Sequence, residues 1–196
     1  MRVEDDDGVR TITFDRPNVM NAMNLEVATE LADAVAEADP VEHDAIVLTG
    51  DDPAFSAGGD IQAMKEREEG PRESYQRVAE TFNRAAAELL NSDVPVVAKI
   101  NGDCVGAGLA IVAASDMAYT VPDATFSCAF IRVGLVPDTA ATFTLPRLVG
   151  LRTAKRLTMT GEFFDGSEAA EMGLVNEAVP EEELDETGDE LAGKLS

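Results

Sequence analysis

The chain has 196 residues, 45% of them hydrophobic, which is enough to bury a sizeable core and is most simply one domain. Its 15 basic and 38 acidic residues give a formal net charge of −23, so the surface repels phosphates and a nucleic-acid partner is not expected. The longest apolar stretches are far shorter than the roughly 20 residues of a membrane-spanning helix, and the acidic start differs from a secretory signal. We therefore expect a cytoplasmic protein with no membrane partner.

The excess of acidic residues also predicts adaptation to salt. In dilute buffer the mutual repulsion of these charges opposes compaction, whereas at about 1 M salt the Debye length falls to roughly 3 Å and the penalty nearly vanishes. We expect a halophilic protein, with an ordinary acidic soluble protein as the alternative.

The cysteine and histidine content excludes several kinds of site. Cys104 and Cys128 are too few for a disulfide framework and are predicted to be reduced thiols in the core. His43 is the only histidine and lies in an acidic run, where we expect a surface loop. A Ser-His-Asp triad and a Cys/His zinc site are therefore not expected, and no metal site is predicted.

The first half of the chain alternates strand and helix patterns. Apolar spacing predicts a strand over residues 9–14, a helix over 24–38 with Asn24 as its N-cap, a strand over 45–49 and one long helix over 73–90.

The second half repeats this alternation. It predicts strands over 96–100, 117–121 and 125–126, a buried helix over 108–115 and a loop over 133–138 that feeds a helix near Thr139. Helices over 151–157 and 167–172, a closing strand over 174–179 and an acidic tail helix over 181–195 follow. The order indicates an α/β protein with a largely buried sheet.

Two glycine-rich segments are the most informative features of the chain. They cover residues 55–61 (Phe-Ser-Ala-Gly-Gly-Asp-Ile) and 101–108 (Asn-Gly-Asp-Cys-Val-Gly-Ala-Gly), and each follows an apolar run and leads toward a helix. Two such loops suggest two backbone N–H donors aimed at one oxygen, as stabilisation of an enolate from a thioester or amide requires.

With these elements in place, the chain resembles the crotonase superfamily, also called the enoyl-CoA hydratase/isomerase superfamily, from Thr11 to about Val179. The resemblance rests on seven segments in the family's order: 15–23, 46–50, 54–61, 101–116, 134–138, 145–150 and 169–175. It implies a spiral of strand-strand-helix (ββα) repeats over a core at 1–180, with 181–196 starting a C-terminal helical region. It also implies a homotrimer or hexamer that binds an acyl-CoA thioester, with coenzyme A as part of the substrate and no separate cofactor.

The resemblance further implies the site residues. The oxyanion hole is expected at the backbone N–H groups of Ala57 and Ala107, although Gly106 and Gly108 could merely permit a tight turn. Arg16 or Lys65 could meet a phosphate or be solvated, and we favour an N-cap role for the Asp60 side chain. The expected substrate and coenzyme A contacts are Asn18, Met20, Ala22, Gly58, Gly59, Asp60, Ile61, Val105, Gly106, Phe130, Leu135 and Pro137.

The sequence departs from the family pattern where hydratases carry two glutamates. Those positions hold Ala110 and Phe130, which cannot exchange protons, so hydration is disfavoured. Asp138 remains nearby, at a place where isomerase branches of the family use an aspartate as acid and base. We expect burial against Phe130, Leu135 and Phe143 to raise its pKa; the alternative is an N-cap for the following helix.

The second departure is length. The helical cover that family members carry at the C-terminus is expected to be missing or supplied differently, so a truncated chain, a short member and an inactive paralogue are all alternatives. The first functional hypothesis is an enoyl-CoA isomerase; the others are a hydratase with carboxylates from elsewhere and a catalytically silent acyl-CoA binding protein.

Overall fold

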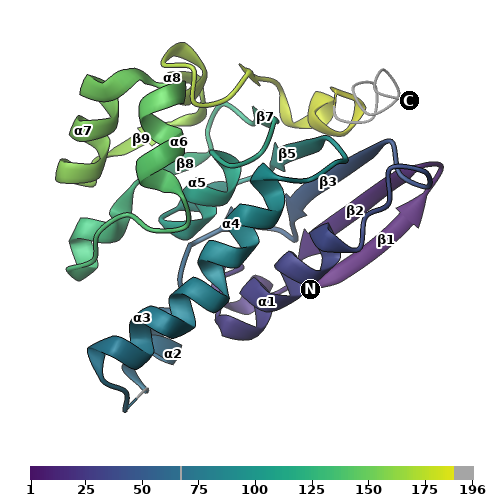
Figure 1. The fold of residues 1–196 in the computed structure, drawn as a ribbon. Helices are drawn as coiled ribbons and strands as arrows, with labels where there is room; N and C mark the ends of the chain where they lie inside the picture. Colours follow the sequence, from purple (N-terminus) through teal and green to yellow (C-terminus); the bar gives the residue numbers. More distant parts are fainter. Residues whose placement is uncertain (67, 188–196) are drawn as a thin grey trace.

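The computed structural model describes residues 1–66 and 68–187, which form two sheets surrounded by helices (Figure 1). The larger sheet has the order β1–β2–β3–β5–β7–β10, and the smaller has the order β4–β6–β8–β9. The strands of the larger sheet are β1 (Arg2–Asp6), β2 (Val9–Phe14), β3 (Ala45–Gly50), β5 (Val96–Ile100), β7 (Met117–Thr120) and β10 (Glu177–Ala178). Those of the smaller sheet are β4 (Ala54–Ser56), β6 (Asp103–Val105), β8 (Thr125–Ser127) and β9 (Phe163–Asp165).

The connectivity of the two sheets makes a spiral. The chain places β3, β5 and β7 side by side in the larger sheet, and after each of them it adds a strand to the smaller sheet, namely β4, β6 and β8. All of these neighbours pair in parallel. A helical segment follows each pair of strands, so the predicted α/β spiral of ββα repeats is confirmed.

Helices cover the larger sheet and fill the space beside it. The helices up to residue 171 are α1 (Leu25–Ala36), α2 (Ile61–Lys65), α3 (Pro71–Glu80), α4 (Phe82–Leu90), α5 (Ala107–Val112), α6 (Ala141–Leu148), α7 (Gly150–Thr160) and α8 (Gly166–Glu171), with 3₁₀ turns η1 (Pro17–Val19) and η2 (Ala129–Val133). In Figure 1, α1 and α4 lie side by side over the sheet. The predicted N-cap is confirmed, because the Asn24 side chain accepts a hydrogen bond of 2.9 Å from the Val27 amide at the start of α1.

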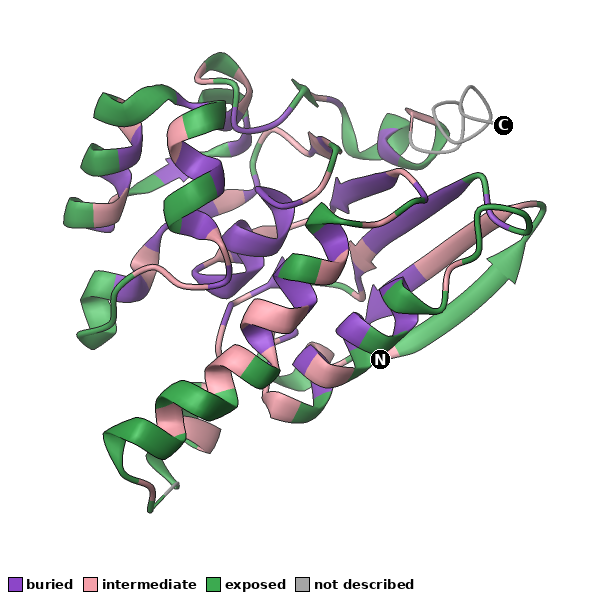
Figure 2. Ribbon diagram, in the orientation of Figure 1, coloured by how far each residue is buried: buried purple, intermediate pink, exposed green. Residues whose placement is uncertain are grey.

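The core lies between these layers, and α5 is its innermost helix. All six residues of α5 are buried, as its nearly unbroken apolar sequence predicts, and Figure 2 shows the burial concentrated in α5 and the central strands. A short helix with no exposed face can be held only by neighbours on all sides. The segment that ends in this helix is therefore fixed firmly in the fold.

The single long helix predicted over 73–90 is wrong. The structure breaks it at Thr81, whose φ of −120° and ψ of −85° lie outside the helical region, and α3 and α4 meet there. The two helices have different surroundings: α4 buries residues such as Phe82, whereas α3 buries none and projects away from the sheets (Figure 2). The apolar pattern runs across the break because residues on both sides of it pack with the core and also line a cavity.

Other element boundaries also differ from the prediction. Strands β1 and β9 are not predicted, because β1 is exposed and strongly charged and β9 is only three residues long. The closing strand expected over 174–179 pairs only at Glu177–Ala178, and the helix expected near Thr139 begins at Ala141. Residues 181–187 are helical, and the rest of the predicted tail helix, 188–196, lies outside the described residues.

The expectation of a surface His43 is wrong. Its side chain is 5% exposed, its Nδ1 accepts a hydrogen bond from the Asp39 amide, and its Nε2 lies 3.3 Å from a carboxylate oxygen of Asp5. The unpredicted strand β1 brings Asp5 to this position from far away in the sequence. The imidazole therefore ties the loop of residues 39–43 to the edge strand β1 and does not line the cavity.

Both cysteines, Cys104 and Cys128, are free and buried, as predicted. Within the described ranges, no cluster of three or more His, Cys, Asp or Glu side chains is arranged to hold a metal ion. Across those same residues, no helix combines the length and apolar character needed to cross a membrane.

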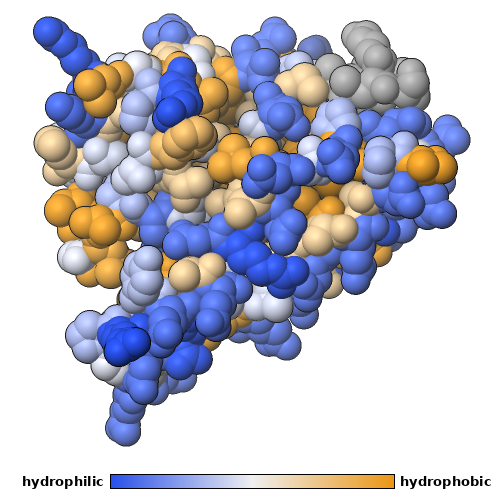
Figure 3. Space-filling view, viewed as in Figure 1, coloured by the Kyte–Doolittle hydropathy of each residue, from blue (hydrophilic) through white to orange (hydrophobic). Residues whose placement is uncertain are grey.

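We expect the free energy of unfolding to increase with salt. In the face drawn in Figure 3, hydrophilic side chains cover most of the surface. The whole chain has 38 acidic residues and only 15 basic residues to pair with them. Screening of their repulsion should raise the melting temperature by about 5 °C or more between 0.05 M and 2 M KCl. Differential scanning calorimetry measures this, with sucrose as a control for general exclusion of cosolutes; a melting temperature that is flat in KCl contradicts the halophilic prediction.

Candidate active site

The smaller sheet brings the two glycine-rich segments together. Strands β4 and β6 are parallel neighbours, with Ala54 opposite Asp103 and Ser56 opposite Cys104. The loops that follow the two strands therefore leave the sheet at the same edge, which is where open α/β sheets present ligand sites.

The two loops approach so closely that only glycine fits at their contact. Gly58 has a φ of +86°, and a Cβ at this position would lie 2.6 Å from the Val105 carbonyl oxygen and 3.2 Å from the Ala107 amide nitrogen. Gly106, on the other loop, has a φ of +56° and immediately precedes α5. The close pair of loops predicted from the sequence is confirmed, and the tight turn at Gly106 is one part of it.

The backbone hydrogen bonds of the first loop show that its free N–H donor is not the predicted one. The Ala57 N–H donates to the Met20 carbonyl oxygen at 2.8 Å, so it is already used within the protein. The Gly59 N–H, two residues later, makes no hydrogen bond to any part of the chain that the structure describes, although Gly59 lines the cavity. The available donor on this loop is therefore Gly59, and the choice of Ala57 is wrong.

The neighbours of Gly59 are tied down on both sides. The Gly58 amide donates to the Ser56 hydroxyl at 3.2 Å, and the Asp60 amide donates to the Met23 carbonyl at 2.9 Å. The Met23 amide donates in turn to the Gly58 carbonyl at 2.7 Å. These bonds hold the peptide of Gly59 rigidly while leaving its own N–H unpaired.

On the second loop, Ala107 is the residue whose N–H makes no hydrogen bond within the part of the chain that the structure describes. It is the first residue of α5, where an N–H group has no acceptor within the helix, and it also lines the cavity. The preceding amide, that of Gly106, donates to the Ser127 carbonyl at 2.9 Å. Each loop thus presents one unpaired amide to the same cavity.

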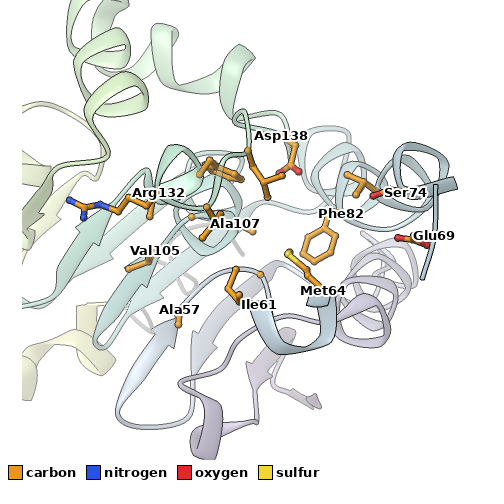
Figure 4. Close-up of a pocket in the computed structure, with 17 residues that line it drawn as sticks. Ala57, Ile61, Met64, Glu69, Ser74, Phe82, Val105, Ala107, Arg132 and Asp138 are labelled. Atoms are coloured by element: carbon orange, nitrogen blue, oxygen red, sulfur yellow. The ribbon is translucent and has the colours of Figure 1, made fainter. Parts of the chain in front are cut away.

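The cavity between the loops and helices has a volume of about 360 Å³ (Figure 4). Its predicted members are Ala57, Gly59, Ile61, Val105, Gly106, Ala107, Phe130, Leu135 and Asp138. The predicted residues Asn18, Met20, Ala22, Gly58, Asp60 and Pro137 do not line it. The residues that sequence reasoning missed are Met64, Glu69, Ser74, Val78, Phe82, Ala129, Arg132 and Val133.

The missed residues belong mainly to α2, α3, α4 and η2. Val78 and Phe82 carry part of the helical apolar pattern, and they line the cavity as well as packing with the core, from either side of the break at Thr81. Periodicity shows that a helix face is covered and does not show by what. The feature that identifies these residues is that α3 extends beyond the sheets, and the sequence does not show this.

Two cationic candidates for phosphate contacts have different surroundings. Arg16 donates to the Ala22 carbonyl and to the Asp60 carboxylate at 3.1 Å, so it is engaged inside the protein, whereas Lys65 is exposed. The N-cap role of Asp60 is confirmed, since its carboxylate accepts from the Ala63 amide at 3.0 Å. That backbone bond, together with Arg16, lowers the pKa of Asp60.

Asp138 lies in the cavity wall and does not cap a helix. The helix that follows begins at Ala141 without any side-chain cap, which rules out the alternative N-cap role. The Asp138 carboxylate accepts a hydrogen bond of 2.9 Å from the Thr139 hydroxyl, and burial raises its pKa. Phe143, one of the residues expected to bury it, is instead 51% exposed and packs on Arg147.

Two other charged side chains, Glu69 and Arg132, border the cavity, and both are engaged by other groups of the protein. Glu69 is ion-paired with Arg77 at 2.7 Å. Arg132 donates to the Gly161 carbonyl and lies over the Phe163 ring, and Figure 4 shows its guanidinium turned away from the other labelled side chains.

The two positions expected to hold glutamates in a hydratase are apolar in the structure as well. Ala110 is fully buried in α5, and Phe130 lies in the cavity wall with 6% of its surface exposed. Among the described residues that line the cavity, the carboxylates are Asp138 and the paired Glu69. Ala110 and Phe130 therefore cannot activate a water molecule as two glutamates would.

Comparison with known proteins identifies the family that the chain matches. The family model described as "Enoyl-CoA hydratase/isomerase" matches residues 4–196. A probable enoyl-CoA hydratase of Rhodobacter capsulatus is 37% identical over 184 residues, covering 92% of this chain and 69% of that protein. The 1,2-epoxyphenylacetyl-CoA isomerase of Escherichia coli is 31% identical, covering 96% and 73%.

Solved structures agree with this match. The crystal structure of a protein from Mycobacterium abscessus, titled a putative enoyl-CoA hydratase/isomerase, superposes with a TM-score of 0.91 at 33% identity, over 99% of this chain and 76% of that one.

Proposed function

The chain belongs to the enoyl-CoA hydratase/isomerase family, and we propose that it moves a double bond within an enoyl thioester of coenzyme A, with Asp138 as acid and base. The observation that carries the proposal is the pairing, in one cavity, of two unpaired backbone amides with a partly buried carboxylate that has no cationic partner in the described structure.

The two amides suit the thioester carbonyl. A carbonyl oxygen placed between the N–H groups of Gly59 and Ala107 accepts both bonds, and these bonds strengthen when the oxygen becomes an enolate. Ala107 adds the positive end of the α5 backbone to this stabilisation. The donors are fixed before the reaction, so no reorganisation is needed as the charge develops.

The reaction of a 3-enoyl thioester needs one proton-transferring group. Asp138 takes a proton from C2, and the electron pair of that C–H bond forms a dienolate whose charge rests on the carbonyl oxygen. The same carboxyl then returns the proton to C4 while the double bond settles between C2 and C3. Burial, which raises the pKa of Asp138, makes the carboxylate a stronger base and its acid form a usable donor.

Coenzyme A is the expected carrier portion of the substrate, and no separate cofactor is required by this chemistry. The segment around Asn18 to Ala22 lies beside the first loop, to which Met20 is hydrogen-bonded, so it borders the site without lining the acyl cavity. This location supports a role for the segment in binding the coenzyme A portion outside the cavity.

A homotrimer or hexamer is part of the proposal. It is supported by apolar side chains exposed on η2, the loop after η2, α6 and α7, since η2 and α6 both contact α7 and large exposed apolar patches commonly mark interfaces. These side chains are Ile131, Val133, Val136, Phe143, Leu148 and Leu151, and each is more than 40% exposed.

The test is the appearance of conjugated-enoyl absorbance when a 3-enoyl-CoA is incubated with the protein in molar KCl. A parallel incubation with a 2-enoyl-CoA follows the loss of that absorbance on hydration. An increase in the first reaction without a decrease in the second supports isomerisation. A decrease in the second reaction alone identifies a hydratase, and tight thioester binding with neither change identifies a binding protein.

A further inference from the structure

The loop that carries Asp138 has an unusual backbone. Thr139 and Ala140 are consecutive non-glycine residues with φ values of 50° and 60°, both in the left-handed region. Such residues are strained and persist only where the surrounding structure holds them. The direction of the Asp138 side chain therefore depends on whatever holds the next two residues.

One hydrogen bond from another element holds this loop. The Asn83 side-chain oxygen, on α4, accepts the Thr139 N–H at 3.0 Å. Among the described residues, the other hydrogen bonds of 136–140 stay within the loop or run to the start of α6. Thr139 is fully buried, so water cannot replace Asn83 as the acceptor.

The same turn of α4 forms part of the cavity wall. Phe82, the residue before Asn83, lines the cavity together with Asp138 (Figure 4). The Thr139 hydroxyl donates to the Asp138 carboxylate at 2.9 Å, so the residue held by Asn83 is also the one that touches the acid. A chain of two hydrogen bonds thus connects α4 to the carboxylate.

We propose that Asn83 is a positioning residue that fixes where the Asp138 carboxylate points in the cavity. The inference rests on the proposed function, in which Asp138 transfers the proton. Asn83 does not line the cavity and acts only through Thr139.

Three variants separate this role from a general effect on folding. Asn83→Leu keeps the approximate size and removes the acceptor, whereas Asn83→Asp keeps an oxygen acceptor and adds a negative charge. Asn91→Ala is the matched control, because Asn91 ends the same helix and donates only to the Ala87 carbonyl.

The expected results differ for each variant. Asn83→Leu lowers kcat for isomerisation by between about 10-fold and 100-fold with little change in KM, because misplacement of the reacting group reduces the rate without removing substrate contacts. Asn83→Asp keeps most of kcat and moves the pH profile upward, since a nearby negative charge raises the pKa of Asp138. Asn91→Ala behaves like the parent protein.

A second readout does not depend on activity. Carbon-13 NMR of the carboxyl groups, with the Asp138 signal assigned from its loss in Asp138→Asn, follows the titration of that group directly. The other charged groups beside the cavity are Glu69, paired with Arg77, and Arg132, held at the Gly161 carbonyl; none of the three variants changes them. In Asn83→Leu the pKa of Asp138 should fall toward its ordinary value as the freed carboxyl turns toward solvent.

The outcomes distinguish the two proposals. If kcat and the Asp138 titration of Asn83→Leu match the parent, the positioning role is overturned. If the parent does not isomerise but the titration moves in the variants, positioning stands and the proposed function fails. If Asn83→Leu does not fold, Asn83→Asp decides: an upward shift in the Asp138 titration supports the role, and an unchanged titration overturns it.

Discussion

Replacement of Asp138 by asparagine is expected to lower kcat for isomerisation by about 10³-fold, within the range that a single general acid or base contributes. The amide has the same shape and still accepts the Thr139 hydroxyl bond, but it cannot take a proton from C2. KM should change little, because the amides of Gly59 and Ala107 still hold the carbonyl. Steady-state kinetics with a 3-enoyl-CoA measures both constants.

The pH dependence gives this variant a second, opposite effect on stability. Burial raises the pKa of Asp138 above its unfolded value, so the folded state binds the proton more tightly and the free energy of unfolding decreases as pH rises through that pKa. Asp138→Asn removes the charge from this partly buried position and should be more stable than the parent at neutral pH. Loss of activity accompanied by a lower melting temperature would indicate a structural role and contradict the assignment.

Isomerase activity of the parent should rise with pH as Asp138 loses its proton. The rise should be centred above the ordinary aspartate pKa, because only the carboxylate removes the C2 proton. An activity that is independent of Asp138 would point to a different proton-transferring group and favour the hydratase alternative.

The fold could be predicted from the sequence because the features that mark it are local. Gly58 and Gly106 mark backbone conformations that other residues rarely adopt, and the unbroken apolar run after Gly106 marks a helix without an exposed face. Each feature constrains its own few residues, and their order along the chain defines the spiral. No such local feature marks the break between α3 and α4 at Thr81, because the apolar pattern continues through it.

The site was less accessible, since its functional atoms are defined by long-range pairing. Whether the N–H of Ala57 or that of Gly59 is unpaired depends on Met20, more than thirty residues earlier, whose carbonyl accepts the Ala57 N–H. Side-chain identity carries no information about that choice. The role of Asn83 is hidden for the same reason, because its partner Thr139 lies on a loop 56 residues away.

The oxyanion donors can be tested without changing a polar side chain. Ala107→Pro removes the N–H at the first position of α5, where proline is well accepted because that N–H has no helical partner. Loss of one such donor typically lowers kcat by about 10² to 10³-fold, and the proline ring also occupies space at the carbonyl site. We therefore expect a decrease of about 10³-fold in kcat, measured with the same 3-enoyl-CoA.

Ala107→Gly is the matched control, because it changes the same side chain and keeps the N–H. It should retain kcat within about 10-fold, the remaining loss reflecting the greater backbone freedom of glycine at the start of a buried helix. If Ala107→Pro folds with an unchanged melting temperature and still isomerises the substrate at the parent rate, the carbonyl is not held at α5. If the proline and glycine variants lose activity equally, the loss comes from the altered backbone of the loop and not from the missing donor.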